Sequence, residues 1–172
     1  TCIAPDYLVV HGSIKDVFVD ELKKTITRFY GNEISNSKDF GRIVNERHTQ
    51  RLVKIIEKDR EKVVFGGSYN IGERYIEPTV IDGVTWEDES MKDEIFGTIL
   101  PIMYFNDISQ VITMINERPK PLALYVFTEN QSVQNKVMEN TSSGGSCIND
   151  TISHFSSHHL PFGGVGHAGM GA

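Results

Sequence analysis

Short apolar runs of strand length alternate with helical repeats along the second half of the chain. The runs Ile99–Phe105 and 123–127 are rich in β-branched and aromatic residues, as buried strands are. In 108–117 and 132–139 the apolar residues recur at three- and four-residue spacings, which indicates amphipathic helices. Because parallel strands are joined by crossovers that usually contain a helix, this alternation predicts an α/β fold with a mostly parallel sheet flanked by helices.

The first half of the chain carries a weaker form of the same pattern. A strand is expected at 7–10, and Ser13 then caps a helix whose apolar residues share one face. A second helix is expected over 45–59. Residues 74–81 alternate well enough for an extended segment, in which Pro78 indicates a sheet edge or a bulge.

Length and composition fit one ordinary globular domain. The chain has 172 residues, of which 39% are hydrophobic and 23% charged, a balance that argues against a disordered chain. The expected organisation is a thiol-bearing α/β domain over residues 1–153. It is followed over 154–172 by a segment rich in Gly and His without periodicity, which we expect to be a loop near an active site and a subunit interface.

Charge and hydropathy argue against several classes of function. A net charge of -6 without a basic stripe disfavours nucleic-acid binding, which relies on Lys and Arg to neutralise phosphates. No apolar stretch approaches the roughly 20 residues that cross a bilayer, and no secretory signal is visible. Two cysteines are too few for a disulfide framework, which favours a reducing, cytoplasmic compartment.

Cys2 is the residue on which a chemical interpretation depends. A cysteine nucleophile acts as its thiolate, which a helix terminus or a nearby cation favours, and the flanking residues supply neither. From these neighbours alone, an unpaired cysteine is more often a small buried apolar residue than a nucleophile.

Four blocks, in the same order along the chain, resemble the aldehyde dehydrogenases of the class 3 type. The first, Thr1-Cys-Ile-Ala-Pro-Asp-Tyr7, is similar to the stretch around the catalytic cysteine of that family. The resemblance covers essentially the whole chain. The other blocks are Glu94-Ile-Phe-Gly97 followed by Leu100-Pro101, then Gly144-Gly-Ser-Cys-Ile-Asn-Asp150, and finally Leu160-Pro-Phe-Gly-Gly-Val-Gly166 running into Gly169-Met-Gly171.

The resemblance implies oxidation of an aldehyde to a carboxylic acid with NAD or NADP as cofactor. Cys2 would be the nucleophile, and its backbone N–H would help to bind the oxyanion of the thiohemiacetal. Hydride transfer to the nicotinamide and hydrolysis of the resulting thioester would complete the reaction. The expected partner is a small aldehyde substrate, and a homodimer is expected because members of the family are commonly dimers or tetramers.

The resemblance also assigns roles to residues outside the cysteine block. Glu94 would bind the hydroxyls of the nicotinamide ribose, and Phe96 would pack near the ring. Asn149 would lie at the catalytic pocket and organise nearby backbone, and Phe162 would line the substrate entrance. The family motif continues with Pro where this chain has Thr98, a change expected to relax the turn into the next strand. Taken without the resemblance, Glu94 is an ordinary exposed residue and Asn149 a turn residue.

Two patterns in the tail are given no function of their own. Gly164-Val-Gly-His-Ala-Gly169 matches the dinucleotide-binding pattern, but no convincing strand precedes it and no helix follows it. We expect these glycines to permit close backbone packing and positive φ angles. His154, His158 and His159 have spacings that would suit metal ligands on a helix, but they lie in a non-periodic segment without Cys, Asp or Glu, so no metal site is expected.

The resemblance also leads us to expect that the chain is the C-terminal part of a longer protein. The general-base Glu, the oxyanion-binding Asn and the cofactor-binding domain would lie upstream, and these residues alone would be inactive. Two other interpretations stay open. Thr1 could be the nucleophile of a self-processed N-terminal-nucleophile hydrolase, a class that the strand–helix alternation fits poorly. The chain could also be an inactive, truncated relative retained as a subunit-interaction piece.

Overall fold

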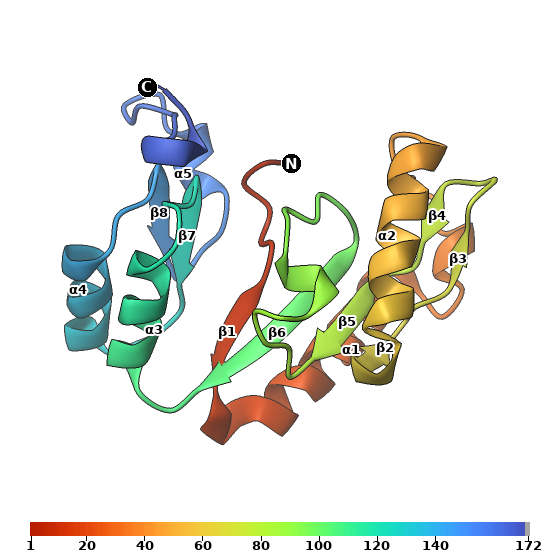
Figure 1. Ribbon diagram of the computed structural model, residues 1–172, viewed down its shortest axis with the longest axis horizontal. Coiled ribbons are helices and arrows are strands. Elements are labelled where there is room, and N and C mark those ends of the chain that lie inside the picture. The colour runs from red at the N-terminus through yellow and green to blue at the C-terminus, as the bar shows by residue number, and fades with distance from the viewer. Residues whose placement is uncertain (171–172) are drawn as a thin grey trace. The chain divides into compact units, whose positions relative to one another are not determined.

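The computed structural model describes residues 1–170, which form two compact units. The first unit spans Asp6–Tyr104, and the second combines residues 1–5 with residues 105–170. The predicted α/β fold with a mostly parallel sheet is confirmed, because each unit contains paired parallel strands with helices beside them (Figure 1). The organisation expected from the sequence, with a boundary after residue 153, stays a prediction.

The first unit contains a four-stranded sheet and a two-stranded ribbon. Its strands are β1 (Leu8–His11), β2 (Val63–Phe65), β3 (Tyr69–Asn70), β4 (Tyr75–Ile76), β5 (Thr79–Asp82) and β6 (Ile99–Phe105). The sheet has the order β1-β6-β5-β2, with β5 parallel to β6 and antiparallel to β2. The ribbon pairs β3 with β4. The antiparallel strand β2 therefore forms one edge of the sheet.

Two long helices cover opposite faces of this sheet. They are α1 (Lys15–Tyr30) and α2 (Glu46–Lys58), and the 3-10 turns of the unit are η1 (Gly12–Ile14), η2 (Ile34–Asn36), η3 (Arg60–Lys62) and η4 (Glu89–Met91). Val80 and Ile81 are neighbours on β5, so their side chains point to opposite faces. Val80 packs in a cluster with Val19 of α1, whereas Ile81 packs in a cluster with Leu52 of α2. All four side chains are buried, and each face of the sheet has its own core.

The second unit is built on two parallel strands, β7 (Ala123–Val126) and β8 (Gly145–Ile148). Its helices are α3 (Ile108–Asn116), α4 (Gln131–Asn140) and α5 (Ser153–Ser156), with a 3-10 turn η5 (Gly166–Ala168). Helices α3 and α4 lie side by side (Figure 1), and Asn116 Nδ2 donates to the carbonyl of Asn140 at 2.7 Å. In the register of the two strands, Tyr125 lies opposite Cys147.

One local expectation is wrong, and another is confirmed in part. Ser13 does not cap α1: it lies in η1, where its backbone N–H donates to His11 Nδ1 at 3.2 Å, and α1 begins at Lys15. The segment expected to be extended over 74–81 does contain strands, but it is divided into β4 and β5, which belong to different sheets. Pro78 lies between them, and because proline has no N–H to donate to a ladder, regular pairing stops there.

Candidate active site

The turn that carries Cys2 is held from both sides in the second unit. The backbone N–H of Ala4 donates to the carbonyl of Thr1 at 3.1 Å, which closes the turn. The side chain of Ile3 is buried, and the backbone carbonyl of Ile3 accepts a hydrogen bond of 2.6 Å from the hydroxyl of Tyr125. With Ile3 fixed inward, the side chain of Cys2 is left exposed.

The other cysteine has a different environment. Cys147 on β8 is only 8% exposed, and its Sγ lies 3.3 Å from Nδ1 of His154 and 3.4 Å from Oγ of Ser153. A buried thiol with two polar neighbours is poorly accessible to an external carbonyl carbon, whereas Cys2 is accessible. Accessibility therefore favours Cys2 over Cys147 as the nucleophile.

Asn149, directly after β8, is hydrogen-bonded to the loop that follows β7. Its Oδ1 accepts the backbone N–H of Thr128 at 2.8 Å, and its Nδ2 donates to the carbonyl of Thr128 at 3.2 Å. The backbone of Asn149 is left-handed, with φ of 56°, a conformation that Asn adopts more readily than most residues. The side chain thus organises neighbouring backbone, while its place in a catalytic pocket stays a prediction.

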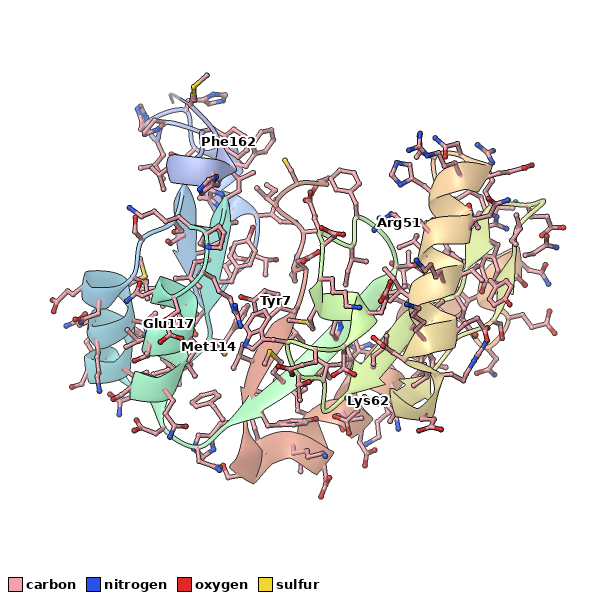
Figure 2. The ribbon with its side chains drawn as sticks, in the orientation of Figure 1. Tyr7, Arg51, Lys62, Met114, Glu117 and Phe162 are labelled. Carbon is pink, nitrogen blue, oxygen red and sulfur yellow. The ribbon has the colours of Figure 1, made fainter. Side chains whose placement is uncertain are left out.

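Phe162 belongs to an aromatic group at the end of the second unit, beside α5 (Figure 2). Its ring stacks on that of His154, with centroids 6.3 Å apart, and meets Phe155 edge-on at 5.3 Å. Gly145 leaves room for the histidine, because a Cβ at that position would lie 2.5 Å from His154 Cδ2. Phe162 is 41% exposed and is therefore available to an apolar ligand.

The glycines of the tail serve packing, as the sequence predicts. A Cβ on Gly164 would lie 2.3 Å from the carbonyl carbon of Ala168, and one on Gly144 would lie 2.3 Å from the carbonyl oxygen of Gly163. Gly166 has a positive φ of 61°. The segment therefore folds back on itself, and the helix that a dinucleotide-binding loop requires does not follow among the described residues. Gly171, part of the fourth block, lies outside the described residues.

In the first unit, Arg51 and Asp6 hold the backbone of the loop that precedes β6. Arg51 projects from α2 toward this loop (Figure 2), and its guanidinium donates to the carbonyl of Glu94 at 3.1 Å and also to that of Ile95. Oδ1 of Asp6 accepts the backbone N–H of Ile95 at 2.9 Å. Burial raises the pKa of Asp6, while the Ile95 N–H and the charge of Arg51 act in the opposite direction.

In the loop that precedes β6, contacts with the core determine which side chains are buried and which are exposed. Ile95 is 2% exposed, and Gly97 lies against Leu52, since a Cβ there would lie 2.5 Å from Leu52 Cδ1. Glu94 is exposed, and Phe96 is 54% exposed with a positive φ of 50°. Such a φ is strained for a residue with a bulky side chain. The loop thus exposes a carboxylate and an aromatic ring, while their contact with a cofactor stays a prediction.

Thr98 does not leave the following turn relaxed, contrary to the expectation from its replacement of Pro. Its hydroxyl donates to the carbonyl of Ile76 on β4 at 3.0 Å, and its own carbonyl accepts the backbone N–H of Thr79 at 2.8 Å. The two bonds fix the entry to β6 in place of a proline ring.

The structure divides the predicted site residues between the two units. Cys2, Asn149 and Phe162 lie in one unit, and Glu94 and Phe96 lie in the other. Among residues 1–170, no three His, Cys, Asp or Glu side chains come together in a way that could hold a metal ion. No helix in the same range is both long and apolar enough to cross a membrane.

Comparison with known proteins identifies the family. The sequence profile of the aldehyde dehydrogenase family matches residues 1–172. The 4,4'-diaponeurosporen-aldehyde dehydrogenase of Staphylococcus aureus is 47% identical over 99% of the chain, and the dimeric NADP-preferring aldehyde dehydrogenase of Rattus norvegicus is 46% identical over 100%. Other relatives, at 45% identity, carry family 3 names. The chain therefore belongs to the aldehyde dehydrogenase family, which confirms the class 3 resemblance.

The fold agrees with this assignment. A substrate-bound structure of Staphylococcus aureus AldH superposes on 99% of the chain with a TM-score of 0.97 and 47% identity. The chain spans 37% of that structure, and it spans 37% and 38% of the lengths of the Staphylococcus and Rattus relatives.

Proposed function

We propose that these residues form the thiol-bearing part of an enzyme that oxidises an aldehyde to a carboxylic acid with NAD or NADP. The observation that carries this proposal is the exposed thiol of Cys2. The turn that bears this thiol is fixed, because the next residue, Ile3, is buried and its backbone carbonyl is hydrogen-bonded to Tyr125 of β7. An exposed thiol on a fixed backbone meets the first requirement of nucleophilic catalysis, which is a nucleophile held in a defined direction.

In the proposed reaction, the thiol of Cys2 loses its proton to water, its Sγ forms a bond to the carbonyl carbon, and the π electrons of the C=O bond move to the oxygen. The backbone N–H of Cys2 is a donor for this oxyanion. Loss of the aldehyde hydrogen as hydride leaves a thioester on Cys2. Water then breaks the C–S bond, which releases the carboxylic acid and regenerates the thiol.

The cofactor supplies the hydride acceptor when it is bound. The loop before β6 has suitable groups for it: the carboxylate of Glu94 accepts hydrogen bonds from vicinal ribose hydroxyls, and the ring of Phe96 offers a flat apolar face. Both side chains are exposed, and their backbone is fixed by Arg51 and Asp6. The Rattus relative is named a dimeric, NADP-preferring aldehyde dehydrogenase, and this name supports a nicotinamide cofactor and a dimer here.

Steady-state formation of reduced nicotinamide tests the proposal in the protein that contains this chain. Replacement of Cys2 by Ser is expected to lower kcat by at least about a thousand-fold, because an alcohol is far less nucleophilic than a thiolate. Cys147→Ser and Thr1→Ala are the matched controls and are expected to retain turnover. Hydrolysis of an amide that is lost in Thr1→Ala, with no formation of reduced nicotinamide by the wild type, would point instead to an N-terminal-nucleophile hydrolase.

A further inference from the structure

The hydroxyl of Tyr125 joins two segments of the second unit that are far apart in the sequence. It donates to the carbonyl of Ile3 at 2.6 Å, across 122 residues. Ile3 is the residue directly after Cys2, and the backbone that this bond fixes is the backbone that sets the direction of the thiol. A short hydrogen bond to a buried residue of a four-residue turn leaves that turn little freedom.

The surroundings of Tyr125 keep its hydroxyl in the donating form. Burial raises the pKa of the phenol, a backbone hydrogen bond from Ile152 lowers it, and the charges of Cys147 and Cys2 raise it further. The net direction is upward, so the phenol stays protonated where a thiol would ionise. A phenolate could only accept a hydrogen bond, and it would repel the carbonyl oxygen of Ile3.

The ring of Tyr125 is itself fixed in place. Tyr125 lies opposite Cys147 in the ladder of β7 and β8, and its ring centroid is 6.0 Å from that of His154. Beyond β8 the chain makes a strained turn in which Ile152 has φ of 66°, a conformation that β-branched residues rarely adopt. Strained backbone of this kind persists where the surrounding contacts hold it, as they do around functional sites.

We infer that Tyr125 is a positioning residue for Cys2: its hydroxyl, by binding the carbonyl of Ile3, holds the turn in the orientation that presents the thiol to the substrate. The inference rests on the proposed function of Cys2. It assigns to Tyr125 no contact with substrate or cofactor, and its effect on the reaction passes through the backbone of residues 1–4.

The test compares Tyr125→Phe with Tyr104→Phe in the protein that contains this chain. Each variant removes one partly buried phenol hydroxyl, and that of Tyr104 donates to Asp82 in the first unit. Hydrogen–deuterium exchange is measured on peptides that cover residues 1–5, and kcat and the KM values for an aldehyde and for the cofactor are measured on the same samples. The exchange measurement does not depend on turnover, so it separates a failure of this inference from a failure of the proposed function.

Tyr125→Phe is expected to speed exchange of the Ala4 amide and to lower kcat about ten-fold with little change in the cofactor KM, since misorientation of a reacting group reduces the rate of the chemical step. Tyr104→Phe is expected to change neither quantity. Unchanged exchange at residues 1–5 in Tyr125→Phe overturns the inference, and so does faster exchange with wild-type kcat. A wild-type protein without turnover contradicts the proposed function, while the exchange result still decides whether Tyr125 holds the turn.

Discussion

The carboxylate of Asp6 binds the backbone N–H of Ile95 at 2.9 Å, across 89 residues of sequence. Asp6 belongs to the same motif as Cys2, and Ile95 lies between the two residues proposed to contact the cofactor. Two sequence blocks of the family are thus joined by one hydrogen bond within the first unit. The bond explains why an acidic residue at the end of the first motif has a structural role in the second.

Replacement of Asp6 by Ala is expected to raise the KM for NAD or NADP about five-fold, because the buried Ile95 N–H loses its acceptor and the loop loosens. Asp6→Asn keeps an oxygen acceptor and is expected to have a smaller effect. Steady-state kinetics with the cofactor as the varied substrate measures both. The exposed Asp39 provides the control, Asp39→Ala. An unchanged cofactor KM in Asp6→Ala would mean that the loop keeps its conformation without this bond.

The carboxylate of Glu94 gives a second prediction about the cofactor. Glu94→Gln is expected to raise the cofactor KM about ten-fold, because a neutral amide is a weaker acceptor for two ribose hydroxyls than a carboxylate is. Asp93→Asn removes the same charge one residue earlier and is expected to leave that KM unchanged. Equal effects of the two substitutions would indicate general electrostatics and would argue against a specific contact at Glu94.

Gly145 is expected to be intolerant of any side chain because of His154. In Gly145→Ala, the new Cβ would lie 2.5 Å from His154 Cδ2, so the imidazole must move and disturb its stack with Phe162. We expect a several-fold rise in the aldehyde KM and partial restoration in the double variant Gly145→Ala/His154→Ala. Gly72→Ala is the control, since its nearest contact would be an ordinary 3.6 Å. A double variant no better than the single one would show that His154 is not the obstacle.

Glu89 makes part of the stability of the first unit dependent on pH. Hydrogen bonds from Lys92 and Lys58, at 2.7 and 3.2 Å, lower the pKa of Glu89 to about 2 from an ordinary value of 4.5. A carboxyl group whose pKa is lowered in the folded state stabilises the fold at pH values above its ordinary pKa. That contribution is lost as the pH falls toward about 2.

Glu89→Gln is therefore expected to lower the urea midpoint of unfolding at neutral pH, and the gap to wild type should close between pH 4.5 and about 2. High salt should also narrow the gap, because the lysine partners are largely exposed. Glu139→Gln is the control, as Glu139 forms no ion pair within residues 1–170. A gap that does not change with pH would contradict the assigned cause.

The sequence predicts the regular elements well where periodicity and local signals agree. The strand Ile99–Phe105 has the predicted bounds, and α2 begins after Asn45, whose side chain caps it by accepting the backbone N–H of His48. The prediction is wrong at Ser13, which lies within the 3-10 turn η1, a turn that the side chain of His11 caps by accepting the backbone N–H of Ser13. Which residue caps a turn depends on the backbone angles around it, and the order of residues in the sequence does not give these angles directly.

The supporting residues of the site are harder to find than the motif residues. Arg51 lies in an amphipathic helix, where an arginine is usually part of a solvated face, and Tyr125 lies in a strand where any aromatic residue fits. Their hydrogen bonds to the backbone of Ile95 and Ile3 span 44 and 122 residues. Only the tertiary fold brings such partners together, so the spacing of residues along the chain does not reveal them.

The central claim is that Cys2 forms a covalent bond with the aldehyde carbon, and trapping of the acyl-enzyme tests it most directly. The protein that contains this chain is mixed with an isotopically labelled aldehyde and oxidised cofactor, quenched in acid, digested and analysed by mass spectrometry. We predict a labelled thioester on the peptide that contains Cys2, and none on the matching peptide of Cys2→Ser. Label on Cys147, or turnover with no label on either cysteine, would contradict the claim.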